Sequence, residues 1–242
     1  MPDFVGIGAM RAGTSWYARN LRKHPDIYIG TKEIHFFDRR IHEWRLYIAG
    51  DFVNQLRYGN WFWRGKLSGR VTGEYTPAYG ILEREKIALV KSWMPDVKLI
   101  FSMRDPAQRA WSQARKHFPQ FHGKPVEQAS RDELMRFFSS EGVVSRGDYA
   151  SCLANWLSYF PIEQLHTSYL EDVERQPKDI LKSAFTFLEV DAEAPIDWAS
   201  VGIPVNSRAA AVIPPDIDTE LQDLVFPQRE RLRRILGRAP PW

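Results

Sequence analysis

The sequence DFVGIGAMRAGTS, residues 3–15, says most about the architecture of this chain. Its first six residues read as a short buried strand, and a helical pattern runs from 14 to 24. A tight turn bounded by Gly8 and Gly13 joins the two. This order surrounds the turn with backbone N–H groups and with the positive end of a helix dipole. The stretch therefore predicts a site for a phosphate-like anion.

The glycines of this turn have the spacing of a Walker A loop, G-x-x-x-x-G-K-[ST], but Thr14 occupies the position of the lysine. Arg11 is the only side-chain cation inside the turn. We therefore expect Arg11 and the backbone up to Ser15 to hold a phosphate-like group. An ordinary nucleoside triphosphatase is not expected.

Strand-like and helical patterns alternate along the whole chain. Apolar runs typical of strands occur at 4–7, 27–29, 71–74, 97–103 and 165–170, and helical patterns occur at 14–24, 81–93, 106–118, 148–159, 177–188 and 218–236. Strands that alternate with helices predict βαβ units around a parallel sheet. No linker or repeat divides the 242 residues, of which 44% are hydrophobic, enough for a sizeable core. The sequence predicts an α/β fold, a single P-loop-like domain over 1–242 with a central parallel sheet flanked by helices.

Two segments, 39–66 and 119–146, have weaker periodicity and are expected to form loops or short helices that cover a site. Trp16, Trp93 and Trp156 fall at helical spacings and are expected in the core.

The composition limits the classes of function and the location. A net charge of +3, from 33 basic and 30 acidic residues, is too small to indicate bulk nucleic-acid binding. The single cysteine, Cys152, suits a reducing compartment, and the six histidines show no metal-site spacing. There is no apolar run long enough to span a membrane and no signal segment after Met1. We expect a cytoplasmic protein without a metal, and the sequence carries no signature of an oligomeric state.

A second candidate anion site follows the strand-like run 97–103. Arg104 comes directly after this run, and Pro106 suits the first turn of the next helix. Open parallel sheets bind ligands beyond the carboxyl ends of their strands, so Arg104 is expected at the same crevice as the 8–15 turn. Ser112 lies about two helical turns further on and can share that face. The alternative is that Arg104 and Asp105 only cap the turn from strand to helix.

The segment KEIHFF, residues 32–37, is a third candidate. Its aromatic residues can anchor a turn that leaves Glu33 and His35 at the crevice. A carboxylate there can act as general base on a hydroxyl, and Lys32 can bind an anionic group or tune the carboxylate. The alternative is a surface turn with solvated charges.

Two further segments give weaker signals. In GEYTPAY, residues 73–79, a strand ends and the chain turns at Pro77, so that Tyr75, Pro77 and Tyr79 are candidates for binding a substrate. A core tyrosine is the alternative for Tyr79. In the late proline-bounded loop, Ser207 and Arg208 form a possible anion clamp, although an exposed arginine in a loop is common.

Together these segments resemble the sulfotransferase family that uses 3′-phosphoadenosine-5′-phosphosulfate (PAPS), particularly its bacterial and glycan-modifying branch, which includes the heparan sulfate sulfotransferases. The residues that carry the resemblance are 8–15, 24–27, 32–38, 104–112, the GDYASCLANWLSYFP stretch at 147–161, and 169–172. Two positions depart from the family pattern. Arg11 stands where the family usually has lysine, and Tyr75 stands where several glycan sulfotransferases have another lysine.

The resemblance implies in-line transfer of a sulfuryl group from PAPS to a hydroxyl of a glycan or a small natural product, without a metal. Glu33 would accept the proton of the acceptor hydroxyl, and His35 would position either Glu33 or the acceptor. Charge on the leaving oxygen would be stabilised by Arg11 and the amides of Ala12, Gly13, Thr14 and Ser15. The family pattern further implies that the 5′-phosphate is bound by Thr14 and Ser15, and the 3′-phosphate by Arg104, Ser112, Ser207 and Arg208.

Two other classes of function stay open on the residues alone. One is a P-loop nucleotide or small-molecule kinase, which would need magnesium, and the other is a protein that binds a phosphorylated nucleotide without chemistry. The assignment to a PAPS-dependent enzyme requires Arg11 and Arg104 to reach one ligand. The acceptor, whether glycan, phenolic natural product or lipid head group, has no signature in the sequence.

Overall fold

The computed structural model describes residues 1–38, 52–205 and 212–242, except for the side chains of 224–227. A five-stranded sheet lies at its centre, built from β1 (Phe4–Gly8), β2 (Ile27–Tyr28), β3 (Val71–Tyr75), β4 (Lys98–Met103) and β5 (Leu165–Tyr169). The strand order is β2-β3-β1-β4-β5, and each neighbouring pair is parallel. The predicted central parallel sheet is confirmed, and all five strands fall on the predicted apolar runs.

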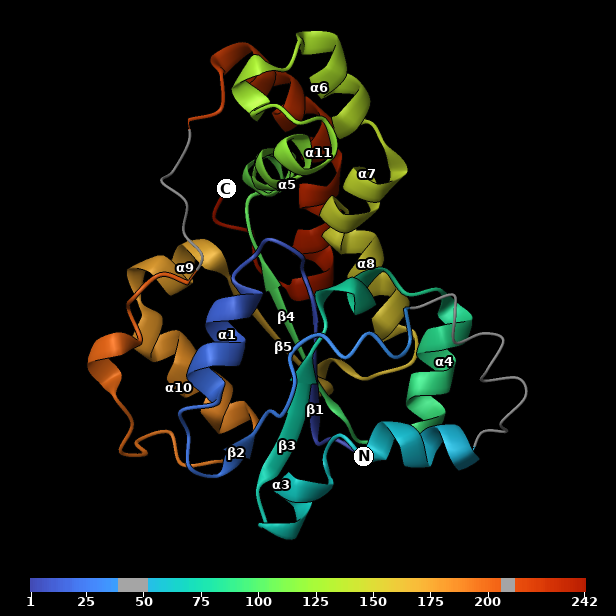
Figure 1. Cartoon of the computed structure of the whole chain (residues 1–242), viewed down its shortest axis with the longest axis vertical. Coiled ribbons are helices and arrows are strands. Elements are labelled where there is room, and N and C mark those ends of the chain that lie inside the picture. The colour runs from blue at the N-terminus through green and yellow to red at the C-terminus, as the bar shows by residue number, and fades with distance from the viewer. Residues whose placement is uncertain (39–51, 206–211) are drawn as a thin grey trace.

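Helices cover both faces of the sheet and its carboxyl end (Figure 1). The described helices are α1 (Thr14–Leu21), α3 (Trp63–Leu67), α4 (Arg84–Trp93), α5 (Pro106–Phe121), α6 (Arg131–Phe138), α7 (Glu141–Gly147), α8 (Tyr149–Leu157), α9 (Leu170–Arg175), α10 (Pro177–Phe187) and α11 (Pro215–Leu236). The 119–146 segment, expected to hold loops or short helices, contains the end of α5 with α6 and α7. Of the 39–66 segment, residues 39–51 lie outside the described residues.

Two hydrophobic cores hold helices against the two faces of the sheet. On one face, Tyr17 of α1 and Phe185 of α10 pack with Tyr75 of β3. On the other face, Trp93 of α4 and Trp156 of α8 pack with residues of β1 and β4. These side chains are almost entirely buried, and burial of large aromatic side chains contributes most to the stability of such layers.

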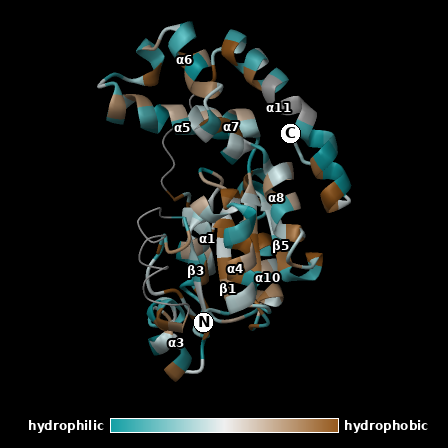
Figure 2. Ribbon diagram, turned by 90° about the vertical axis from the view of Figure 1, so that its right-hand side faces the viewer, coloured by the Kyte–Doolittle hydropathy of each residue, from teal (hydrophilic) through white to brown (hydrophobic). Residues whose placement is uncertain are grey.

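A third hydrophobic core lies beyond the carboxyl ends of the strands. It joins Trp111 and Phe118 of α5 to Leu134 of α6, Val143 of α7 and Ile217 of α11. These helices form a cap above the sheet in Figure 1. Figure 2 shows hydrophilic residues along much of α11, whereas hydrophobic residues gather around the strands. The cap therefore has a core of its own, separate from the two cores that hold helices against the sheet.

The order of the strands places the two predicted anion segments side by side. β1 lies between β3 and β4, so the chain leaves β1 and β4 at neighbouring points of the same edge. The crevice at such a switch point is the usual ligand site of open parallel sheets. No helix in the described ranges is long and apolar enough to cross a bilayer.

Candidate functional site

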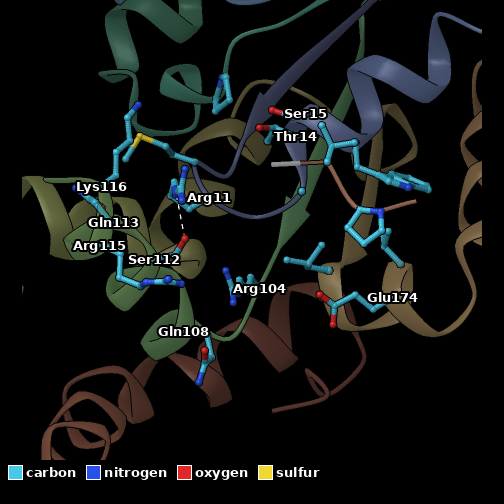
Figure 3. Close-up of a pocket in the computed structure, with 18 of the residues that line it drawn as sticks. Arg11, Thr14, Ser15, Arg104, Gln108, Ser112, Gln113, Arg115, Lys116 and Glu174 are labelled. Atoms are coloured by element: carbon cyan, nitrogen blue, oxygen red, sulfur yellow. Dashed lines mark hydrogen bonds between the residues drawn. The ribbon is translucent and has the colours of Figure 1, made fainter. Parts of the chain in front are cut away.

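A cavity of about 540 Å³ opens between the loop after β1 and helix α5. This volume is in the range of small-molecule sites. Polar groups line one part of it, namely Arg11, Thr14, Ser15, Lys32, Glu33, Arg104, Gln108, Ser112, Gln113, Arg115, Lys116 and Glu174. Figure 3 shows Arg11 and Arg104 both extending into the space that α5 and the loop enclose. The two arginines that the sequence analysis required to reach one ligand therefore share one cavity.

The loop after β1 ends in a helix start that suits an anion. Gly13 precedes α1 with φ 85°, in the left-handed region that favours glycine. A Cβ at this position would lie 3.0 Å from Cδ1 of Leu170, so the space beside the loop is also restricted. The first N–H groups of a helix have no acceptor inside the helix, and here Thr14 and Ser15 add their hydroxyl groups at the cavity wall. Ala12, which the sequence analysis also expected at the ligand, is fully buried, does not line the cavity, and donates its N–H to the carbonyl of Ala9 at 3.2 Å.

Arg11 and Ser112 are connected directly. Nε of Arg11 donates a hydrogen bond of 3.0 Å to Oγ of Ser112 (Figure 3). Ser112 lies on α5, and Arg104 comes at the end of β4 just before this helix, so both sit on the wall opposite α1. The predicted two-turn spacing from Arg104 to Ser112 thus brings a guanidinium and a hydroxyl to one side of the cavity. An arginine beside a hydroxyl is a favourable site for a phosphate group.

The turn that carries Arg104 is held by hydrogen bonds behind the cavity. The side chain of Asp105 caps α5 by accepting from the N–H of Gln108 at 2.9 Å, and the N–H of Asp105 donates to Oε1 of Glu171 at 2.9 Å. Oη of Tyr149 donates to the carbonyl of Arg104 at 3.0 Å. Asp105 caps the helix, whereas the side chain of Arg104 lines the cavity, so the turn does more than cap α5.

Burial sets the pKa of Glu171. The side chain is desolvated, which raises its pKa, and the hydrogen bond from the Asp105 N–H and the charge of Arg104 reduce that rise without cancelling it. The pKa of Glu171 therefore stays above its usual value.

Lys32 links the anion loop to Glu33. Its Nζ donates to Oγ of Ser15 at 2.8 Å and lies 2.8 Å from Oε1 of Glu33. His35 stands behind Glu33, with Nε2 at 3.7 Å from Oε2 of Glu33 and Nδ1 at 2.7 Å from Oδ2 of Asp38. Lys32 and Glu33 line the cavity, and the imidazole contacts the carboxylate from outside it. A carboxylate held between a cation and an imidazole can accept a proton from a hydroxyl at the cavity.

These neighbours determine the protonation of Glu33. Partial burial acts to raise its pKa, but the hydrogen bond and charge of Lys32, followed by His35, outweigh burial and bring the pKa below its usual value. Glu33 is therefore ionised, and able to accept a proton, at neutral pH.

The other predicted substrate residues have different surroundings. Pro77 lines the cavity. Tyr75 and Tyr79 are fully buried: Tyr75 stacks on Tyr17 with ring centroids 5.9 Å apart, and Oη of Tyr79 takes part in hydrogen bonds inside the core. A core position was the alternative for Tyr79, and both tyrosine side chains have it. Ser207 and Arg208 lie outside the described residues.

The sequence analysis missed the apolar part of the cavity. Its lining includes Trp16 together with Leu170, Val173, Pro204 and Val205. Trp16 was expected in the core, and it does pack there, with Nε1 donating to the carbonyl of Val201 at 2.8 Å, but it also borders the cavity. Its position next to Ser15 was the one signal in the sequence, because that places its ring at the start of the same helix. The remaining lining residues come from distant segments, which no local pattern connects.

No group of three or more His, Cys, Asp or Glu side chains suited to a metal ion occurs in the described part of the chain.

This chain is similar to known proteins in sequence and in fold. The family model described as "Sulfotransferase domain" matches residues 1–197. Heparan sulfate glucosamine 3-O-sulfotransferase 3B1 of Mus musculus is 30% identical over 194 residues, which are 78% of this chain and 46% of that protein. Heparan sulfate glucosamine 3-O-sulfotransferase 6 of Mus musculus is 32% identical over 163 residues, or 66% of this chain and 44% of that protein. The chain thus spans less than half the length of these relatives.

Solved structures share the fold over nearly the whole chain. A sulfotransferase from Alicyclobacillus acidocaldarius matches with a TM-score of 0.72 and 24% identity, covering 99% of this chain and 97% of that one. A mouse sulfotransferase complexed with PAP, SULT7A1, matches with a TM-score of 0.59 and 15% identity over 98% of this chain and 87% of that one. From the extent of the family match and the identity to its curated members, this chain belongs to the sulfotransferase family.

Proposed function

We propose that this protein transfers a sulfuryl group from PAPS to a hydroxyl group of a glycan. One observation carries the proposal: the cations Arg11 and Arg104 share a single cavity with the N-terminus of α1, and Glu33 lies in the wall of that cavity. The resemblance in sequence, the family match and the names of the relatives support the same activity.

The residues of the cavity suit a doubly phosphorylated adenosine. PAPS supplies an activated sulfuryl group on its 5′-phosphate and carries a separate 3′-phosphate. Thr14, Ser15 and the first amides of α1 would bind the 5′ end, and Arg104 and Ser112 the 3′-phosphate, as charged and hydroxyl donors commonly do. The apolar part of the cavity, which Trp16 and Val205 border, would receive the adenine. The solved mouse sulfotransferase complexed with PAP supports this donor.

The transfer needs one proton acceptor and one group that stabilises negative charge. Glu33 would take the proton from the acceptor hydroxyl as its oxygen bonds to sulfur. At the same time the bond between sulfur and the phosphate oxygen breaks, and the electron pair goes to that oxygen. Arg11 would stabilise this charge together with the N–H groups at the start of α1. Such a reaction depends on positioning and electrostatics rather than on a covalent intermediate.

The acceptor is proposed from the curated relatives, which are named as heparan sulfate glucosamine 3-O-sulfotransferases. A sugar hydroxyl would approach from the side of the cavity where Lys32, Glu33 and Pro77 lie. Lys32 would then contact both the donor loop, through Ser15, and the base, through the carboxylate of Glu33.

The test is transfer of labelled sulfate from PAPS to a heparan-type oligosaccharide, with a phenol panel and ATP with magnesium as competing reactions. We expect transfer to the sugar that persists in excess chelator, since no step requires a metal. Glu33→Gln should lower turnover about 10²–10⁴-fold, the range for loss of a general base, while the affinity for PAP stays nearly unchanged. Transfer from ATP alone would contradict the proposal in favour of a kinase. Full turnover in Glu33→Gln would remove Glu33 from the role of base.

A further inference from the structure

A buried carboxyl group outside the cavity interacts with the segment that carries Glu33. Glu74, near the end of β3, is 0% exposed and does not line the cavity. Its Oε1 accepts from Oη of Tyr58 at 2.5 Å and from Oη of Tyr79 at 3.3 Å, and its Oε2 accepts from Oγ1 of Thr76 at 2.6 Å. A buried carboxyl group is costly unless donors surround it, and here three hydroxyl groups do so.

The segment 33–36 needs support from outside because of its backbone. Glu33 has φ 64° and His35 has φ 55°, both in the left-handed region, where residues with a Cβ are disfavoured. Such backbone persists only where the surrounding structure determines it. Two strained residues this close together, one of them the proposed base, require an anchor.

Two backbone N–H groups of the segment bond to residues 75 and 79. The N–H of Glu33 donates to the carbonyl of Tyr75 at 3.0 Å, and the N–H of Phe36 donates to Oη of Tyr79 at 2.8 Å. The Tyr79 hydroxyl thus accepts from the Phe36 N–H and donates to Glu74, so that Glu74 holds the segment through Tyr79.

We propose that Glu74 is a positioning residue for the reaction: through the Tyr79 hydroxyl its carboxylate holds the 33–36 segment in the backbone conformation that places Glu33 at the cavity. This inference rests on the proposed function for the role of Glu33. The three hydroxyl groups around Glu74 all donate to it, so an amide in place of the carboxylate would bring an additional donor to a site already full of donors. Burial raises the pKa of Glu74, and the hydroxyl donors and the Ile34 N–H oppose that rise.

Two variants test this, Glu74→Gln and Tyr79→Phe, with Tyr17→Phe as the matched control. Tyr17 is an equally buried tyrosine whose hydroxyl donates to Oγ of Ser168 at 2.6 Å on the opposite face of the sheet. Loss of the Tyr17 hydroxyl should lower the free energy of unfolding by a comparable amount, because the hydroxyl is equally buried. It should not change the contacts of the 33–36 segment. Tyr79→Phe keeps the ring in the core, so that the test does not depend on the folding of Glu74→Gln.

The measurements are kcat, the affinity for PAP, and hydrogen exchange of the peptide 32–37. In both variants we expect kcat to fall about 10²-fold, as for a small displacement of a reacting group, with PAP affinity within threefold of wild type. Hydrogen exchange of residues 32–37 should accelerate in both variants, whereas exchange of residues 14–21 should not. The control Tyr17→Phe should change neither kcat nor the exchange of residues 32–37. Unchanged exchange of 32–37, or a kcat equal to that of the control, overturns the proposal. A wild-type protein without sulfuryl transfer contradicts the proposed function instead, and the exchange data still decide whether Glu74 holds the segment.

Discussion

Nε of Arg11 and Oγ of Ser112 are 3.0 Å apart although 101 residues separate them in sequence. Their hydrogen bond joins the loop after β1 to α5 and therefore ties together opposite walls of the cavity. A hydroxyl group can accept from a guanidinium and still donate its own hydrogen to an anion. Ser112 is thus able to donate a hydrogen bond to a ligand and to orient Arg11 at the same time.

Ser112→Ala tests this double contact. The variant removes the hydroxyl and leaves both arginines charged, so we expect the affinity for PAP to fall about tenfold, the value of one hydrogen bond to a charged group. Titration calorimetry with PAP measures the loss. Ser158→Ala is the control, because Oγ of Ser158 is exposed and bonds only to the carbonyl of Asn155. An equal loss in both variants would contradict a ligand contact at Ser112.

Arg104→Ala should distinguish the two ends of the ligand. If this guanidinium binds the 3′-phosphate, affinity falls about 10- to 10²-fold for PAP but hardly at all for adenosine 5′-phosphate. Arg175→Ala, in the last turn of α9 and exposed, provides the control for a general change in charge. Equal losses of affinity for the two nucleotides would show that Arg104 contributes to the electrostatic potential of the whole cavity and does not bind one particular phosphate.

The pH dependence of turnover should follow the contact between Lys32 and Glu33. A base must be ionised, so activity is lost as the pH falls through the pKa of Glu33, which in the wild type lies below its usual value. In Lys32→Met the main lowering influence disappears, while burial continues to raise the pKa. The acidic limb of the pH profile of kcat should therefore move to higher pH in this variant.

Lys124→Met is the control for that experiment. Lys124 pairs with Glu133 at 2.8 Å in a different part of the chain and brings no charge to Glu33. An acidic limb that stays in place in Lys32→Met would mean that another group controls the proton.

Gly13→Ala should affect both stability and binding. The left-handed φ of 85° costs a residue with a Cβ about 1–2 kcal/mol, and the new Cβ would lie 3.0 Å from Cδ1 of Leu170. Gly123→Ala shares a positive φ of 64° but its Cβ meets open space. Thermal unfolding should show destabilisation in both variants, and calorimetry should show a loss of PAP affinity only in Gly13→Ala. Unchanged PAP affinity in Gly13→Ala would argue against ligand binding at the start of α1.

The strands and the main helices could be predicted because their signals are local. The apolar run at 97–103 followed by Pro106 marks both the end of a strand and the start of a helix, and β4 and α5 begin and end within a few residues of the prediction. The site was predictable where it directly follows such an element, as Arg11, Ser15 and Arg104 do.

The remaining parts of the site depend on contacts between distant residues. Alternate residues of a strand point to opposite faces, but the sequence does not tell which face meets a ligand, and Tyr75 at the end of β3 points into the core. Tyr79, which follows β3 in a short helical turn, also lies in the core. The apolar lining from Leu170 and Val205 is brought to Trp16 only by the packing of the whole chain. The anchoring role of Glu74 depends on its donors in the same way, since a glutamate inside a strand has no distinctive pattern.

Trp111 belongs to the core of the cap and also borders the cavity. The wall formed by α5 is therefore as rigid as the aromatic packing behind it, in which Phe138 lies 6.3 Å from Trp111 between ring centroids. Selection for tight ligand binding would then act on remote apolar side chains of α6 as well as on the charged groups that meet the ligand. Substitutions that repack the core of the helical cap can therefore change which ligands the cavity binds.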